Sequence, residues 1–224
     1  MIFGDDLVVP GSAAAAGWLA PACRGRWGTV GALVPNDFAA YVRIDVPDAE
    51  AADWWDLYRS LFAIVARAGE AHTSTPDEAW FAVWEGYGWA TATSMYAWSG
   101  PSTPATRRRI RVERARLRDQ DRRRRDAIAS GLSVVPRFEL PNRTYHLVAG
   151  TVAGVGSLRE PGSPERWQRP DLWWPADRRW FVATDVDLWS VHVGGTSELA
   201  VDLAAMVPTG VEHVTLDTEL AAED

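Results

Sequence analysis

Two carboxylates and one histidine in the last third of the chain have types and spacing that could do acid–base chemistry. Asp185 and Asp187 are two residues apart in a segment that predicts a strand, so their side chains share one face about 7 Å apart. Such a pair can hold a hard cation or divide acid and base roles, and His192 on the following strand could approach Asp185. The alternative is local, because Asp collects where strands meet turns. We favour the turn interpretation and expect no metal site.

A second candidate combines aromatic and cationic side chains. Trp173 and Trp174 are followed by Asp177, Arg178 and Arg179. A guanidinium beside an indole ring suits cation–π stacking and the recognition of carboxylate or phosphate groups. These five residues therefore predict a binding surface. The alternative is a proline-started helical turn held in place by the two rings.

A third candidate is a basic segment between residues 107 and 125. Its eleven arginines stand against three acidic residues, which gives +8 and leaves −15 elsewhere in a chain of net charge −7. Such a segment could neutralise phosphates, but aromatic residues for base stacking are absent from it and the remainder is acidic. A solvated insertion is favoured, with docking on an acidic protein or contact with nucleic acid as alternatives. The arginines are Arg107, Arg108, Arg109, Arg111, Arg114, Arg116, Arg118, Arg122, Arg123, Arg124 and Arg125.

The remaining motifs for chemistry are incomplete. The four histidines (His72, His146, His192 and His213) have no metal-ligand spacing, and Cys23 is the single cysteine, so a thiolate cluster is excluded. Gly154-Val155-Gly156 begins a dinucleotide fingerprint whose third glycine position holds Arg159. The chain has no Gly-x-Ser-x-Gly element. We expect no cofactor.

Composition places the chain among cytoplasmic globular proteins. Hydrophobic residues make up 47% and charged residues 24%, which allows a core without metals or disulfides. Thirteen Trp residues are unusually many, and several are expected to line a groove or partner surface. Asp5 and Asp6 stand where a signal peptide needs positive charge. Because no run of about 18 apolar residues occurs, a membrane span is not expected.

The elements that must position these candidates follow from periodicity. Alternation over residues 38–46 predicts a strand, and a broad apolar stripe over about 48–68 predicts a buried amphipathic helix. The stripe is centred on Trp54, Tyr58, Leu61 and Val65, with Asp48 as N-cap and Gly69 as the stop.

Further strands are expected at 80–84, 144–148, 180–186, 189–193 and 211–216, with a loop over 161–170 and a helix over 197–206. Residues 99–106 have linker composition, and about 105–130 predict an exposed Arg-rich helical insertion, so 99–131 is linker plus insertion. Since strands and helices do not alternate regularly, we predict one α+β domain over 1–224 with a mainly antiparallel sheet.

Three stretches, residues 76–89, 140–147 and 172–195, resemble an uncharacterised family of hypothetical proteins from high-GC Gram-positive bacteria. The resemblance covers most of the chain except the Arg-rich insertion, and it implies no activity, cofactor or catalytic residue. At the level of fold alone, the strand, the apolar helix and the closing hairpin with its helix look like the small α+β modules of bacterial immunity proteins.

The function favoured at this level is a non-catalytic, protein-binding module, immunity-like or antitoxin-like, whose partner is another protein. One alternative is a small enzyme that uses Asp185, Asp187 and His192. The other is nucleic-acid contact through residues 107–125.

Overall fold

The computed structural model describes residues 2–46, 54–91, 103–141 and 143–220. It is an α+β domain built on one eight-stranded sheet in which every strand pair is antiparallel. The strands run in the order β10 (Glu212–His213), β1 (Ala40–Asp45), β9 (Ser190–Gly195), β8 (Phe181–Thr184), β7 (Leu172–Pro175), β2 (Ala79–Trp84), β4 (Arg143–Gly150) and β3 (Arg137–Leu140). The predicted fold class is confirmed.

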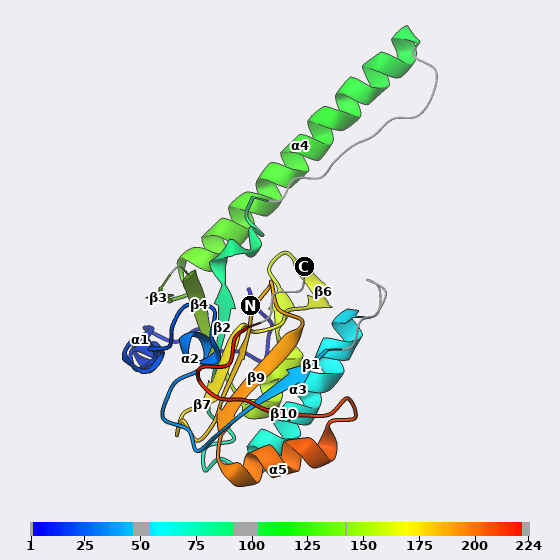
Figure 1. Cartoon of the computed structure of the whole chain (residues 1–224). Helices are drawn as coiled ribbons and strands as arrows, with labels where there is room; N and C mark the ends of the chain where they lie inside the picture. The colour runs from blue at the N-terminus through cyan, green and yellow to red at the C-terminus, as the bar shows by residue number, and fades with distance from the viewer. Residues whose placement is uncertain (1, 47–53, 92–102, 142, 221–224) are drawn as a thin grey trace.

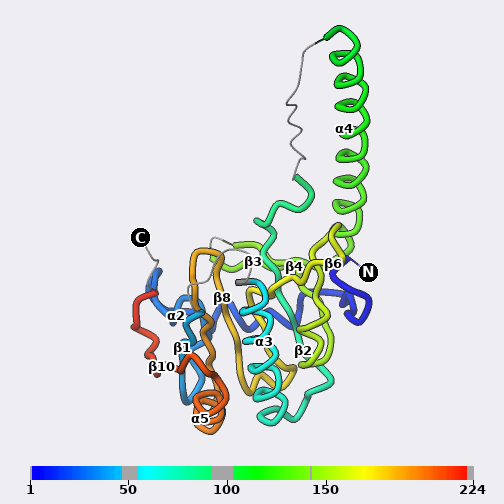
Figure 2. The backbone as a smooth tube through the Cα atoms, turned by 90° about the vertical axis from the view of Figure 1, so that its right-hand side faces the viewer, coloured from blue at the N-terminus to red at the C-terminus, as the bar shows by residue number. Residues whose placement is uncertain are grey.

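The two faces of the sheet are covered by different parts of the chain (Figures 1 and 2). One face carries α3 (Trp54–Ala71) and α5 (Ser197–Met206), with η3 (Val152–Ser157) packed against α3. The other face is covered by residues 13–34, which form the short elements η1 (Ala14–Ala16), α1 (Leu19–Ala22) and α2 (Val30–Leu33). Phe3 and Leu7 belong to the cluster on the α3 side. The sheet therefore separates two apolar clusters.

The inner strands are buried on both faces, which explains why they read as nearly continuous apolar runs. Trp173 and Trp174 of β7 have 0% exposure and belong to opposite clusters. The ring of Trp173 stacks with Phe62 and Phe81, and Trp174 stacks with Phe181. Four of the described Trp residues are thus part of the core: Trp89, Trp173, Trp174 and Trp180.

Helix α3 confirms the predicted apolar stripe. Tyr58, Leu61 and Val65 are buried on its inner face. Residues 47–53, which include the expected N-cap Asp48, and the side chain of Trp54 lie outside the described residues. The predicted stop at Gly69 is wrong, because the helix continues to Ala71. Gly69 serves packing instead: an added Cβ would lie 2.7 Å from the ring of Trp180, whose Nε1 donates to the Gly69 carbonyl at 2.9 Å.

Helix α4 (Pro104–Ser133) is the Arg-rich insertion, and it projects away from the sheet (Figures 1 and 2). Thr103 caps it, accepting from the Thr106 N–H at 3.1 Å, and Pro104 occupies its first turn. Ile128 is its one buried residue. Among the described residues, the contacts that anchor the helix are therefore near its C-terminal end.

Several predicted boundaries are corrected. The segment 161–170 is not all loop, because β5 (Arg159–Glu160) pairs with β6 (Ser163–Trp167). The strand expected to reach residue 186 ends at Thr184. The helical turn considered after Trp173 and Trp174 is not a helix: Pro175 is the last residue of β7, and residues 176–177 form a turn. Strand β3 was not predicted. The remaining short helix, η2 (Glu85–Tyr87), follows β2 and leads into Gly88, whose left-handed φ of +69° glycine adopts without steric cost.

Candidate functional site

The carboxylates predicted to share a strand face lie in the turn between β8 and β9. Asp185 Oδ1 accepts from the Asp187 N–H at 3.0 Å, which is the local Asp turn considered above. Asp185 also pairs with Arg143: the Nη2 atom of Arg143 lies 2.6 Å from the Oδ2 atom of Asp185. The same Nη2 atom lies 3.7 Å from the Oδ2 atom of Asp187, whose side chain is largely exposed. Asp185 therefore neutralises a cation of this chain rather than presenting a vacant ligand.

His192 does not join these carboxylates. It is 2% exposed, and no hydrogen bond or ion pair connects it to Asp185 or Asp187 among the described residues. Burial, together with the nearby guanidinium of Arg43, lowers the pKa of His192 to about 4. The imidazole is neutral at physiological pH, and no group of three metal-ligating side chains occurs in the part of the chain that the structure describes.

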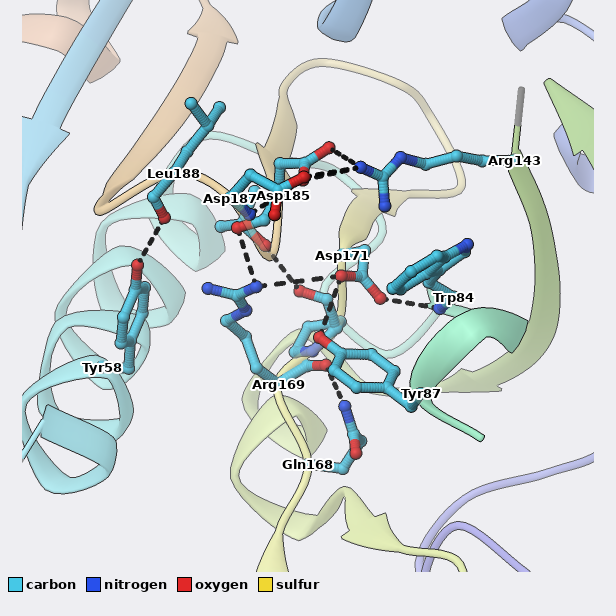
Figure 3. A network of polar contacts seen from close by, with 12 residues as sticks. Tyr58, Trp84, Tyr87, Arg143, Gln168, Arg169, Asp171, Asp185, Asp187 and Leu188 are labelled. Carbon is cyan, nitrogen blue, oxygen red and sulfur yellow. Dashed lines mark hydrogen bonds and ion pairs between the residues drawn. The ribbon is translucent and has the colours of Figure 1, made fainter. Parts of the chain in front are cut away.

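A buried polar network lies under this turn, at the end of the sheet where β7 begins and β2 and β8 end (Figure 3). Its centre is Asp171, which is 3% exposed and directly precedes β7. One oxygen accepts from the Trp84 N–H at 2.7 Å and the other from the Tyr87 hydroxyl at 3.1 Å. Burial raises the pKa of Asp171 to about 6, although Arg169, Trp84 and Tyr87 all favour its charged form.

Arg169 supplies the positive charge of the network. Its Nη2 lies 3.9 Å from Asp171 and donates to the Asp185 carbonyl at 3.0 Å, and its guanidinium lies 4.8 Å from the ring centre of Tyr58. The Tyr58 hydroxyl in turn donates to the Leu188 carbonyl at 3.1 Å (Figure 3). The network thus ties helix α3, the segment before β7 and the β8–β9 turn together.

Arg143 and Trp84 lead from this network to the surface. The Arg143 guanidinium lies 4.6 Å from the ring centre of Trp84, and both residues line a shallow cavity of about 490 Å³ with Glu85 and Glu139. Two of its three charges are already engaged, because Arg143 pairs with Asp185 and Glu85 pairs with Arg137 at 2.9 Å. Glu139 forms no ion pair among the described residues. The arrangement is suited to holding this end of the sheet rigid.

The sequence did not indicate this network. Arg169 lies in the segment 161–170 that was predicted as loop, Asp171 directly follows that segment, and Tyr58 was assigned to an apolar stripe. The available signal was an Arg-Pro-Asp triplet between two aromatic segments. Charged residues so close to a buried strand need partners inside the protein.

The predicted Trp and Arg surface is only partly assembled. The rings of Trp173 and Trp174 are buried on opposite faces of β7, so neither contacts a surface ligand. Asp177 accepts from the Ser74 N–H at 2.7 Å and fixes the loop after β7. Arg178, at φ +57°, places its guanidinium 4.9 Å from the ring centre of Trp18 instead. The expected stacking therefore occurs with a different tryptophan, and Arg179 is exposed beside it.

The arginines of α4 are arranged by the helix into faces. Six of them recur at steps of three and four residues, which places them along one side of the helix over about 27 Å. Five of the six are exposed, and Arg125 is half-buried. We call this set the arginine stripe: Arg107, Arg111, Arg114, Arg118, Arg122 and Arg125.

Within the described part of the chain, most of the stripe lacks counter-charges. Asp119 pairs with Arg122 and Arg123, whereas Arg107, Arg111, Arg114 and Arg118 form no ion pair among the described residues. Arginines three or four residues apart repel one another and destabilise an isolated helix by about 0.2–0.5 kcal/mol per pair.

Comparison of the chain with protein-family models, with curated proteins and with solved structures finds no match in any of the three. Within the described residues, no helix is both long enough and apolar enough to traverse a bilayer.

Proposed function

We propose that this protein is a non-catalytic binding module of the cytoplasm that recognises an acidic partner protein through the arginine stripe of α4. The observation that carries the proposal is the alignment of six arginines on one side of a helix that projects from the domain. An acidic partner surface would remove the repulsion within the stripe, so binding and helix stability would reinforce each other. An immunity-like or antitoxin-like role is the form of such binding that we favour.

A protein partner is favoured over nucleic acid by the charge of the remaining molecule. The segment 107–125 carries +8 and the remainder −15. A polyanion that is drawn to the helix is therefore repelled by the domain beneath it. Helix α4 also contains no aromatic residue on which a base could stack. A folded partner protein can place a local acidic patch on α4 without bringing further negative charge near the acidic domain of this chain.

The carboxylate and histidine alternative has less support. Asp185 is neutralised by Arg143, and His192 is buried and connected to neither carboxylate. General acid–base catalysis needs groups that reach a substrate proton, and no contact among the described residues joins His192 to either carboxylate. We therefore retain the binding module as the proposal.

Two matched double variants test the geometry. Arg111→Gln with Arg118→Gln removes two charges from the stripe, and Arg109→Gln with Arg116→Gln removes two exposed charges from the opposite side of α4. The probes are a synthetic helical peptide with glutamates at three- and four-residue steps and a 20-base-pair DNA duplex, each titrated by anisotropy at two salt concentrations. We expect the stripe variant to weaken peptide binding at least tenfold and the opposite-side variant less than threefold.

Equal losses in both variants would show that only total charge matters and would reject the stripe. Tighter binding of the duplex than of the peptide, with a steep salt dependence, would replace the protein partner by nucleic acid.

A further inference from the structure

A trough lies between α3 and η3, and it shares no lining residue with the cavity beside the buried network. Its volume is about 330 Å³, which is in the range of small-molecule sites. Its lining comes from α3, η3 and the end of β6. The arginine stripe is not part of it, so the inference drawn here is independent of the proposed function.

The floor of the trough is aromatic and rigid. Phe62 is 1% exposed and meets Trp167 edge to face, with ring centroids 5.6 Å apart. The Trp167 indole is fixed because its Nε1 donates to the Val155 carbonyl at 2.9 Å. A fixed aromatic floor presents apolar surface to a ligand without an ordering cost.

Small residues keep the space above this floor open. Ala63 and Ala66 of α3 and Gly156 of η3 line the trough. A Cβ added at Gly156 would meet no atom within 4 Å, and the glycine does not have a left-handed φ. The space therefore depends on side-chain size and not on backbone strain, and it can be filled by substitution without disturbing the fold.

Charge is placed at the two ends of the trough. Arg59 and Arg67 are eight residues apart on α3, which separates them by about 12 Å along the helix. Neither forms an ion pair among the described residues. Glu70, one turn beyond Arg67, also lines the trough and offsets the charge at that end. Asp56 precedes Arg59 by one turn without pairing to it or lining the trough. The less compensated cation is Arg59.

We propose that this trough binds a small amphipathic carboxylate, with its apolar body on Phe62 and Trp167 and its carboxylate on Arg59. An aromatic body suits the edge of Trp167 best, because aromatic pairs gain beyond the area that they bury. The planar guanidinium can hold the carboxylate through two parallel hydrogen bonds.

Isothermal titration of the full chain tests the proposal with phenylacetate, its neutral analogue phenylacetamide, and acetate. We expect saturable binding of phenylacetate, with phenylacetamide at least tenfold weaker and acetate without measurable heat over the same concentrations. Arg59→Gln should weaken phenylacetate at least tenfold and leave phenylacetamide within twofold. Arg67→Gln should change phenylacetate less than threefold, and Arg116→Gln on α4 is the matched control for loss of one remote charge.

Two filling variants locate the site. Gly156→Leu and, on the exposed side of α3, Ala63→Leu should each abolish phenylacetate binding while the melting temperature stays within a few degrees of wild type. Two variants are used so that misfolding of one still leaves a test. Equal affinity for the acid and the amide, no binding of phenylacetate at millimolar concentration, or unchanged binding in a folded filling variant would overturn the proposal.

Discussion

At the scale of single residues, two buried ionisable groups oppose each other in their effect on stability. The pKa of Asp171 is raised to about 6 and that of His192 is lowered to about 4, in both cases mainly by burial. Between pH 4 and pH 6 the native state holds a proton on Asp171 that the unfolded chain releases, so Asp171 makes the protein more stable as pH falls. For His192 the unfolded chain binds the extra proton, so stability is lost as pH falls.

Single variants should separate the two opposing contributions to the pH dependence of the unfolding free energy. Each shift corresponds to about 3 kcal/mol between pH 4 and 6.5. The Asp171→Asn variant loses the contribution of Asp171 and keeps that of His192. The unfolding free energy of this variant, relative to wild type, should therefore decline as pH is lowered from 6.5 to 4. His192→Gln should show the opposite trend between pH 6 and 4. Urea melts at four pH values measure both, and parallel curves for wild type and variants would contradict the assignment.

The residue scale is also where sequence reasoning was least complete. Spacing alone could place Asp185 in a turn, because that preference is local. The network around Asp171 and Arg169 depends on strands β2, β7 and β8 ending at one edge of the sheet. Which strand ends lie together is set by the order of the strands in the sheet, and hydrophobic periodicity does not indicate that order. The same holds for Trp18, which receives the stacking expected of Trp173 and Trp174.

At the scale of elements, helix α3 is the strongest prediction because its apolar stripe is both long and wide. The predicted end was wrong because glycine commonly ends helices, whereas Gly69 lies inside α3 and makes room for the ring of Trp180. Strand β3 was missed because its burial pattern alternates only between exposed and half-buried positions. Element type was thus readable from periodicity, whereas boundaries depended on tertiary neighbours.

Leu61→Ala tests the contribution of α3 to the core. Leu61 is 8% exposed and belongs to the cluster beneath the helix, so truncation should cost about 2–5 kcal/mol through lost burial and a cavity. Ser60→Ala on the exposed side of the same helix is the control and should change stability by less than about 0.5 kcal/mol. Denaturant melts measure both. A cost for Leu61→Ala as small as that of the control would mean that α3 does not carry the core.

At the scale of the whole molecule, charge and packing are separated. The domain beneath carries the acidic excess and the apolar clusters, and α4 carries the basic excess with only Ile128 buried. An added Cβ at Gly162 would lie 2.5 Å from Ile128, so the helix is held closely where it meets the domain. Most of its length contributes little apolar burial, because the exposed arginines stay in water.

This separation predicts that the projecting part of α4 is dispensable for folding. Replacing residues 107–125 by a short Gly/Ser linker keeps Ile128 and leaves a chain of net charge −15. The greater self-repulsion acts against compactness, but salt near 0.15 M screens charges beyond about 8 Å. In that buffer we expect native circular dichroism, less helical signal, and a cooperative melt within a few degrees of wild type.

Ile128→Ala in the full chain is the contrasting variant, and it should cost about 2–4 kcal/mol because it opens a cavity at the anchored end. If the deletion unfolds the domain while Ile128→Ala is neutral, the outer arginines support the core and the assignment of α4 as an appendage is wrong. If the deletion folds and still binds the glutamate helix with unchanged affinity, the domain itself holds the acidic partner. If charge and packing are separate, the deletion variant should fold and should no longer bind the glutamate helix.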